Sequence, residues 1–302
     1  MDNHSKTLAK PFVKWVGGKT RLLDEVKALM PHSLESMTGI TYVEPFVGGG
    51  AVLFWILQEF PNIEHAAIND ANAKLICTYK AVRDNADELV ERLKAIQSEY
   101  LSLGSAERDA YYLEQRAKFN SGGASGCETA ALFIFLNKTC FNGLYRVNSK
   151  GCFNVPHGKY ASPKICDEGT LRADSSILQK VEISCGDFSE TGKFAGPGTL
   201  FYFDPPYKPL TDAGAFTSYT ENGFGDSEQL RLGKFIESIA TSGSTFIASN
   251  SDPKNTGAGD GFFDKLYCKF SIKRVSAPRM VSSSPSGRGR VSEIMVSNTA
   301  GK

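Results

Sequence analysis

The sequence predicts an α/β fold in which an open, largely parallel β-sheet with helices on both faces is interrupted by a mostly helical insertion of roughly a hundred residues. Two observations carry this prediction. Residues 41–70 follow the order strand, glycine turn, helix, strand, which is typical of one βαβ unit. The same alternation returns after about residue 175, whereas residues 72–136 are mostly helical in pattern.

The first half of the chain is interpreted element by element. Strands are expected at 41–44 and 66–70, with a helix beginning at 51 between them. Helices are expected at 86–100 and 106–119, and a loop at 121–126 precedes an apolar run at 127–136. Residues 137–165 are rich in Asn, Gly, Lys, Pro and aromatic residues without clear periodicity, so we expect an irregular surface region.

The second half returns to strands. They are expected at 181–187, 199–204, 245–250 and 292–297, and a helix with a capping-box pattern is expected to start at 226. Acidic residues close several of these runs: Glu44, Asp70, Asp187 and Asp204. Because parallel strands present their carboxyl ends at one edge of a sheet, these acids should gather where such sheets bind ligands.

Composition excludes several classes of protein. The 302 residues are 41% hydrophobic, 22% charged and 11% aromatic, which are globular values. No stretch approaches the length of a membrane span, and the polar N-terminus does not resemble a signal peptide, so we expect a cytoplasmic protein. The seven cysteines lack C-x-x-C spacing and the four histidines lie far apart, so neither a disulfide framework nor a metal site is expected.

Charge is unevenly distributed, although the net charge is only +1. Residues 138–164 hold five basic and no acidic residues, and residues 265–302 hold eight basic residues and one acidic residue. Two basic surfaces on a neutral protein suit a polyanionic partner. Two solvated loops that lack acids would give the same pattern, and charge alone leaves both interpretations open.

The glycine turn at 45–50 follows the first expected strand. A dinucleotide fingerprint would need a third glycine at position 53, which is Leu53, so a pyrophosphate site is disfavoured. Asp70 lies 20 residues beyond Gly50, a spacing that suits a carboxylate on ribose hydroxyls. The pattern fits an adenosine-type ligand, or else a plain tight turn followed by a solvent-facing acid.

The segment 15–20 ends like a phosphate-binding P-loop. The first glycine of that motif is missing, because position 13 is Val13, so phosphate binding of this type is not expected. A Gly-Gly loop with Trp15 and Lys19 could hold a carboxylate and cover an apolar ligand. Alternatively, Trp15 fills the core and Lys19 is solvated.

The tetrad Asp204-Pro205-Pro206-Tyr207 gives the strongest signal. Two prolines rigidify the turn and remove two N–H donors, so the Pro205 carbonyl and the Asp204 carboxylate face one site as acceptors. A planar exocyclic amine matches these two acceptors, and Tyr207 can stack on the ring that carries it. Accepting both protons turns the nitrogen lone pair toward an electrophile.

Together with this tetrad, segments 12–19, 44–50, 142–148 and 153–160 resemble the DNA adenine-N6 methylases of the D12 class. They are most similar to its GATC-methylating branch, which includes methylases that accompany GATC restriction enzymes. The resemblance extends from Lys10 to Asn298. It implies a Rossmann-like S-adenosylmethionine-dependent methyltransferase sheet, formed by residues 1–75 and 175–302, with a target-recognition domain at 76–174 inserted.

The resemblance also implies roles for individual residues. The implied catalytic residues are Asp204, Pro205 and Tyr207; the implied cofactor-binding residues are Trp15, Lys19, Gly48, Gly50, Asp70, Asp187, Phe188 and Asp204; the implied DNA-binding residues are Lys14, Phe141, Asn142, Leu144, Arg146 and Pro156. Phe141 stands where better-known relatives commonly carry Tyr. A serine- and arginine-rich segment, 282–290, resembles a DNA-contacting loop.

We therefore expect methyl transfer from S-adenosylmethionine to adenine N6 in flipped-out bases of duplex DNA, at 5′-GATC-3′ and without a metal. Arg146 would read a guanine, or would instead hold a phosphate. N4-cytosine methylation, N6-adenine methylation of RNA and a non-catalytic DNA-binding protein remain the alternatives. The expected partner is duplex DNA, with a restriction endonuclease alongside, and the expected state is a monomer.

Overall fold

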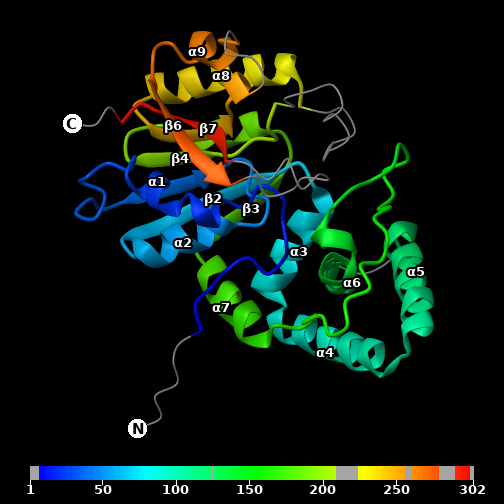
Figure 1. Cartoon of the computed structure of the whole chain (residues 1–302). Helices are drawn as coiled ribbons and strands as arrows, with labels where there is room; N and C mark the ends of the chain where they lie inside the picture. Colours follow the sequence, from blue (N-terminus) through cyan, green and yellow to red (C-terminus); the bar gives the residue numbers. More distant parts are fainter. Residues whose placement is uncertain (1–6, 124–125, 209–223, 256–259, 279–289, 300–302) are drawn as a thin grey trace. The chain divides into compact units, whose positions relative to one another are not determined.

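The computed structural model describes residues 7–123, 126–208, 224–255, 260–278 and 290–299 (Figure 1). By its internal contacts the chain divides into two units. The first unit comprises Met1–Gly18, Gly48–Gln58 and Asn72–Cys185, and the second unit comprises Lys19–Val47, Glu59–Ala71 and Gly186–Lys302. The predicted DNA-recognition domain at 76–174 is a functional assignment that this division does not test.

The strands form a seven-stranded sheet in the order β3-β2-β1-β4-β5-β7-β6. The strands are β1 (Ile40–Glu44), β2 (Ile63–Asp70), β3 (Val181–Cys185), β4 (Thr199–Phe203), β5 (Thr245–Ser251), β6 (Ser271–Pro278) and β7 (Arg290–Ser297). β1 pairs in parallel with β2 and β4, and β4 pairs in parallel with β5. β7 runs antiparallel to β5 and β6. The predicted α/β class with a largely parallel sheet is confirmed.

Three of the four predicted acids lie at the ends of their strands, and the fourth, Asp187, lies beyond its strand. β1 ends on Glu44, β2 ends on Asp70, and Asp204 directly follows β4. Because these neighbouring strands are parallel, the three acids lie at one edge of the sheet. Asp187 lies beyond β3, which ends at Cys185, because its side chain caps the short helix η3 (Phe188–Phe194) by accepting from the Ser189 amide.

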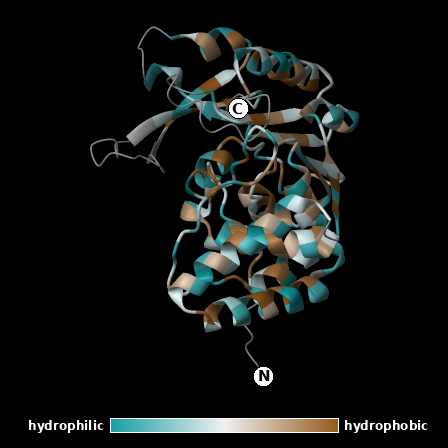
Figure 2. Cartoon of the chain, turned by 90° about the vertical axis from the view of Figure 1, so that its right-hand side faces the viewer, coloured by the Kyte–Doolittle hydropathy of each residue, from teal (hydrophilic) through white to brown (hydrophobic). Residues whose placement is uncertain are grey.

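The second unit is built around strands with large apolar side chains. Phe201, Phe203 and Phe246 are fully buried and pack with Leu232 and Ile236 of helix α8 (Asp226–Thr241). In Figure 2 the helices show hydrophilic and hydrophobic residues side by side along their length, as expected for elements with one buried face. The unit also contains η1 (Lys19–Arg21), α1 (Leu23–Lys27), η5 (Pro253–Asn255) and α9 (Phe262–Leu266).

The expected capping box at the start of α8 is wrong, although the helix does begin at Asp226. The N-cap residue is Gly225, which has no side chain to cap with. The Asp226 carboxylate instead accepts a hydrogen bond from the Lys208 ammonium at 3.1 Å. Asp226 is therefore the first helical residue rather than the cap.

The first unit is mostly helical. Its helices are α2 (Ala51–Glu59), α3 (Ala73–Asp84), α4 (Ala86–Ser102), α5 (Ser105–Ser121), α6 (Gly126–Thr139), η2 (Phe141–Gly143) and α7 (Glu168–Leu178). Helix α6 is buried on all sides and packs against α3, α4 and α5, which surround it in Figure 1. A helix that is apolar on every face belongs in the interior, and α6 holds the segment that follows it.

Candidate functional site

The carboxylate of Asp204 is held by two donors of the second unit. Ser249 Oγ on β5 donates to Asp204 Oδ1 at 2.9 Å, and Lys19 Nζ lies 3.0 Å from the same oxygen. The Lys19 side chain is buried, and its ammonium also lies over the Tyr207 ring, 4.4 Å from the centroid. Two donors on one oxygen fix the rotation of the carboxylate, so Asp204, Tyr207 and Lys19 form one constellation.

Tyr207 is anchored by a residue of β7, which lies two strands from β4 in the sheet. Its hydroxyl donates to Glu293 Oε2 on β7 at 2.6 Å. Burial raises the pKa of the Tyr207 hydroxyl well above its usual value, and the negative charges of Asp204 and Glu293 add to the effect. The hydroxyl is therefore a proton donor at neutral pH. Glu293 is not predicted from the sequence, because nothing local links it to Tyr207, 86 positions away.

Two buried amide side chains form hydrogen bonds that support the proline turn. Gln229 Nε2 on α8 donates to the Pro206 carbonyl at 3.0 Å, and Asn250 Nδ2 donates to Gln229 Oε1 at 3.0 Å. Both side chains are almost completely buried, and Pro205 is buried as well. Buried amides whose hydrogen bonds are all made favour a single conformation. The conformation of the proline turn is therefore fixed by side chains from α8 and β5. Neither amide was identified from the sequence.

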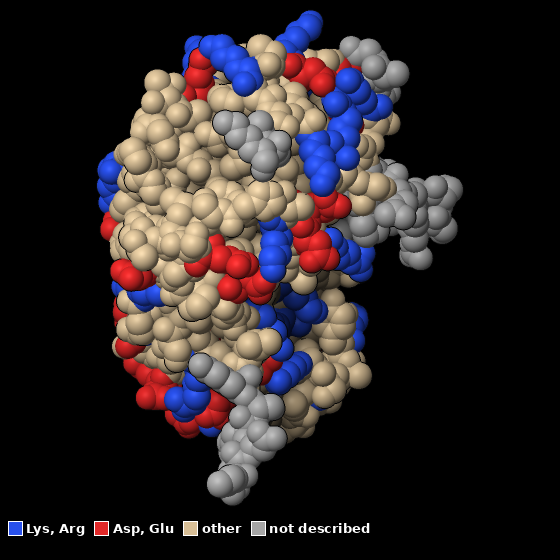
Figure 3. Space-filling model, turned by 90° about the vertical axis from the view of Figure 1, so that its left-hand side faces the viewer, with Lys and Arg blue, Asp and Glu red and all other residues tan. Residues whose placement is uncertain are grey.

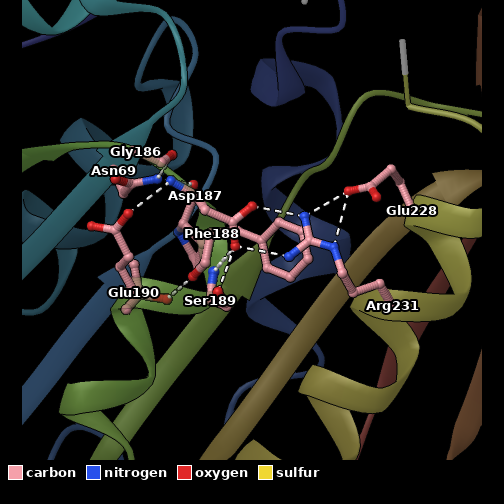
Figure 4. Close-up of polar contacts among 10 residues, drawn as sticks. Asn69, Gly186, Asp187, Phe188, Ser189, Glu190, Glu228 and Arg231 are labelled. Atoms are coloured by element: carbon pink, nitrogen blue, oxygen red, sulfur yellow. Dashed lines mark hydrogen bonds and ion pairs between the residues drawn. The ribbon is translucent and has the colours of Figure 1, made fainter. Parts of the chain in front are cut away.

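Asp187 is fully engaged by side chains of its own unit (Figure 4). Arg231 of α8 donates through Nη1 and Nη2 to the two Asp187 carboxylate oxygens at 2.8 and 2.7 Å. The Arg231 guanidinium holds the pKa of Asp187 well below its usual range, and the Ser189 hydroxyl and amide act in the same direction. The same guanidinium lies over the Phe188 ring, 4.1 Å from the centroid. No pattern in the sequence predicts this role for Arg231.

The end of β2 is tied to the glycine turn and to the segment before Asp187. Asn69 Nδ2 donates to the carbonyls of Pro45 and Gly186, and Figure 4 shows its amide beside Gly186. The Gly186 amide donates to the Asp70 carbonyl at 3.3 Å. Asp70 is only partly buried. The second unit therefore brings Asp70 close to Asp187 in the fold.

The glycines of the turn, which belong to the first unit, are required by packing within that unit. Gly48 and Gly50 have φ values of +48° and +74°, which a side chain rarely adopts. A Cβ at Gly48 would lie 2.8 Å from the Trp15 indole, and one at Gly50 would lie 2.5 Å from the Tyr79 hydroxyl. Trp15 also stacks on Tyr145, at 5.7 Å between centroids. Gly48 therefore packs against Trp15, and Gly50 packs against Tyr79.

The irregular segment after α6 presents several of the predicted DNA-binding residues on the surface of the first unit. Phe141 is 51% exposed, and Asn142, Arg146 and Pro156 are exposed as well. The Phe141 amide donates to the Pro156 carbonyl at 2.9 Å, which joins the two parts of the segment. Leu144, in contrast, is partly buried.

Lys14 and Arg146 are each held by an amide side chain. Asn137 Oδ1 accepts from the Lys14 amide, and Lys14 Nζ lies over the Tyr160 ring at 4.6 Å. Arg146 Nε donates to Asn154 Oδ1 at 2.8 Å. Neither Asn137 nor Asn154 was predicted from the sequence. Asn137 lies 123 positions from Lys14, and Asn154 lies in a segment without periodicity.

The remaining predictions concern the segment 282–290, the surface charge, metal binding and membrane spans. The segment 282–290 lies outside the described residues except for Arg290, the first residue of β7. On the face shown in Figure 3, acidic and basic side chains are interspersed. Within the described ranges, no group of three or more His, Cys, Asp or Glu side chains is placed to hold a metal ion. No helix in those ranges is both long and apolar enough to cross a bilayer.

The structure thus combines a largely parallel α/β sheet, acids at its strand ends and an Asp-Pro-Pro-Tyr turn, and ligands of such sheets bind at the carboxyl ends of the strands. Residues 15–281 match the family described as D12 class N6 adenine-specific DNA methyltransferase, and the chain belongs to this family. Its sheet is thus an α/β S-adenosylmethionine-dependent methyltransferase fold, and the protein is an adenine-specific DNA methyltransferase.

Relatives match over almost their full length. The chain is 44% identical to the Type II methyltransferase M.MjaIII of Methanocaldococcus jannaschii over 276 residues, which cover 90% of this chain and 93% of the relative. It is 37% identical to the Type II methyltransferase M1.LlaDCHI of Lactococcus lactis, with 97% of each chain covered. It is 34% identical to a DNA adenine methylase of Haemophilus influenzae, with 95% and 92% covered.

Proposed function

We propose that this methyltransferase transfers the methyl group of S-adenosylmethionine to the N6 amino group of a flipped-out adenine in duplex DNA, at 5′-GATC-3′. The observation that carries the proposal is the constellation of Asp204, Lys19 and Tyr207 at the end of β4. A carboxylate of fixed rotation beside an aromatic ring matches a planar base that carries an amino group.

The acceptors of this turn direct the amine. We assign Asp204 and the Pro205 carbonyl to the two N–H groups of N6, which turns the nitrogen lone pair away from the ring system. Asp204 would take up the proton that N6 loses when it accepts the methyl group. Tyr207, held by Glu293, stacks on the base and keeps water from it.

The residues assigned to the cofactor have the chemistry that S-adenosylmethionine needs. Asp70 ends β2 and Asp187 caps η3, and these carboxylates suit ribose hydroxyls and an adenine amino group, while Phe188 supplies an aromatic ring beside Asp187. We assign Trp15, Lys19, Gly48 and Gly50 to the methionine end. When bound, the cofactor supplies an activated methyl group, and the chain's own residues bind and orient it.

The sequence specificity is assigned to the exposed segment of the first unit. We propose that Arg146 reads a guanine of GATC through its guanidinium, with Asn154 fixing its direction. Phe141 fills the gap left by the flipped base, while Lys14, Asn142, Leu144 and Pro156 make the neighbouring contacts. The exposure of Phe141 and Arg146 supports this assignment, because both side chains are available to a partner.

The experiment measures tritiated methyl transfer to duplex oligonucleotides. Asp204→Ala removes one of two oriented acceptors and should lower the rate by about a hundredfold or more. Asp24→Asn, which changes an exposed acid of α1, is the control and should leave the rate unchanged. A tenth of the wild-type rate in Asp204→Ala would overturn the assignment. A second series with EDTA tests our proposal that no metal takes part, which loss of activity restored by Mg²⁺ would contradict.

A further inference from the structure

Arg231 makes the contacts at Asp187 and Phe188 that the proposed function assigns to the adenine of the cofactor. Its guanidinium bonds both carboxylate oxygens of Asp187 and lies over the Phe188 ring (Figure 4). A third contact joins Arg231 Nη2 to Glu228 Oε2, at 2.6 Å, one helical turn earlier on α8. All these residues belong to the second unit.

The guanidinium and the adenine edge present the same chemistry. Each is planar, each donates N–H groups in its plane to a carboxylate, and each is attracted to the face of an aromatic ring. Two such groups cannot occupy one carboxylate edge and one ring face together. An adenine that takes the same edge of Asp187 and the same face of Phe188 must therefore displace Arg231.

We propose that Arg231 competes with the cofactor's adenine for Asp187 and Phe188, and that it passes to Glu228 when the cofactor binds. This inference rests on the proposed function, since it takes Asp187 and Phe188 as the adenine site. Arg231 already bonds Glu228 through Nη2 at 2.6 Å and through Nε at 3.1 Å. The guanidinium thus keeps a carboxylate partner while it leaves Asp187.

The pair is weak enough to be displaced. The side chains of Arg231 and Asp187 are 42% and 41% exposed, so water and salt screen their attraction. Exposed ion pairs typically shift an equilibrium by about two- to fivefold, and we expect an effect of this size for Arg231. Arg231 therefore sets the affinity for the cofactor within this range rather than blocking the site.

A related arrangement occurs at the second aspartate of the site. There the Lys19 ammonium pairs with Asp204 and lies over the Tyr207 ring. In both places an aspartate beside an aromatic ring holds a cation of the chain itself. The parallel supports the view that these aspartate–aromatic pairs select N–H donors that approach an aromatic face.

The test is calorimetric titration of the full chain with S-adenosylhomocysteine, a readout that does not depend on activity. Arg231→Met keeps an unbranched aliphatic chain and removes the competing donors, so we expect the Kd to fall about two- to fivefold. Lys234→Met is the matched control on the same helix, because Lys234 is also exposed, and its Kd should stay unchanged. Melting midpoints without ligand confirm that the variants are folded.

A double mutant separates this inference from the proposed function. In an Asp187→Ala background Arg231 no longer has a carboxylate to compete for. Adding Arg231→Met should then no longer tighten the binding of S-adenosylhomocysteine. An unchanged or raised Kd for Arg231→Met alone would overturn the competition while leaving the adenine site in place. An unchanged Kd for Asp187→Ala alone would overturn the adenine site itself, and with it this part of the proposed function.

Discussion

Tyr207 of the Asp-Pro-Pro-Tyr turn donates its hydroxyl proton to Glu293 of β7, at 2.6 Å, across 86 positions of sequence. The turn follows β4, and β7 lies two strands away in the sheet order. The ring that we expect to stack on the target base is therefore oriented by the antiparallel end of the sheet. This relationship makes Glu293 a positioning residue, and its role can be tested.

Glu293→Ala should lower the single-turnover rate of methyl transfer by about tenfold, because a hydrogen bond to a charged group typically contributes about 1.5–3 kcal/mol. Glu293→Gln retains an acceptor and should recover most of the rate. In a Tyr207→Phe background, which lacks the hydroxyl, Glu293→Ala should have no further effect. If the losses of rate from Glu293→Ala and Tyr207→Phe instead add up in the double variant, Glu293 does not act through the Tyr207 hydroxyl.

Gln229→Leu should destabilise the protein by about 1–3 kcal/mol, because it leaves the Pro206 carbonyl and the buried Asn250 amide without their partner. Urea unfolding measures the free energy. Gln115→Leu, at a partly exposed position of α5, is the control and should change it by less than about 0.5 kcal/mol. Equal stabilities for the two variants would contradict the supporting role of Gln229.

Arg146→Ala should relax the base preference at one position and cost about 1–3 kcal/mol of discrimination, if Arg146 reads a base. Lys150→Ala, which removes an exposed cation from the same segment, should instead lower rates evenly on all sequences. Methylation mapped on a random-sequence duplex pool compares the two variants. An even loss of rate for Arg146→Ala would show that it holds a phosphate.

Asp174 gives the first unit a pH-dependent stability. Burial raises its pKa to about 8, against 3.8 for the free group, even though the Lys10 amide donates to Oδ1. The folded state therefore binds the proton more tightly than the unfolded state does. The stabilisation is fully present below about pH 4 and is lost as the pH rises toward 8, by up to about 1.4 kcal/mol per unit.

Asp174→Asn cannot titrate and should flatten this dependence. Urea unfolding at several values between pH 5 and pH 8.5 measures it, and the difference between the wild type and the variant isolates Asp174 from the other groups. The wild type should lose stability relative to the variant as the pH rises. A constant difference across this range would mean that Asp174 does not change its protonation there.

The sequence predicts the parallel core of the fold and the acids at its edge, since apolar runs that end on an acid identify both. β1, β2 and β4 were expected in this way, β5 was expected from its apolar run alone, and Asp204 and Tyr207 are brought together by their own turn. β6 was missed, because Lys273 and Arg274 interrupt the alternation of apolar residues, as is common on an edge strand.

What could not be predicted are contacts set by tertiary packing. Arg231 lies 44 positions from Asp187, and Asn250 lies 21 positions from Gln229. Neither pair has a local signature, because an exposed arginine and a polar strand end fit many environments. The segment that holds Arg146 has no periodicity, so its Asn154 contact depends on the folded turn.

The central claim is that the Asp204 turn directs methylation to adenine N6. The measurement that tests it most directly is mass-spectrometric nucleoside analysis of random-sequence duplex DNA incubated with S-adenosylmethionine and either the wild type or Asp204→Ala. We expect N6-methyladenine as the product of the wild type, located at GATC, and almost none from the variant. N4-methylcytosine as the product, or undiminished N6-methyladenine from Asp204→Ala, would contradict it.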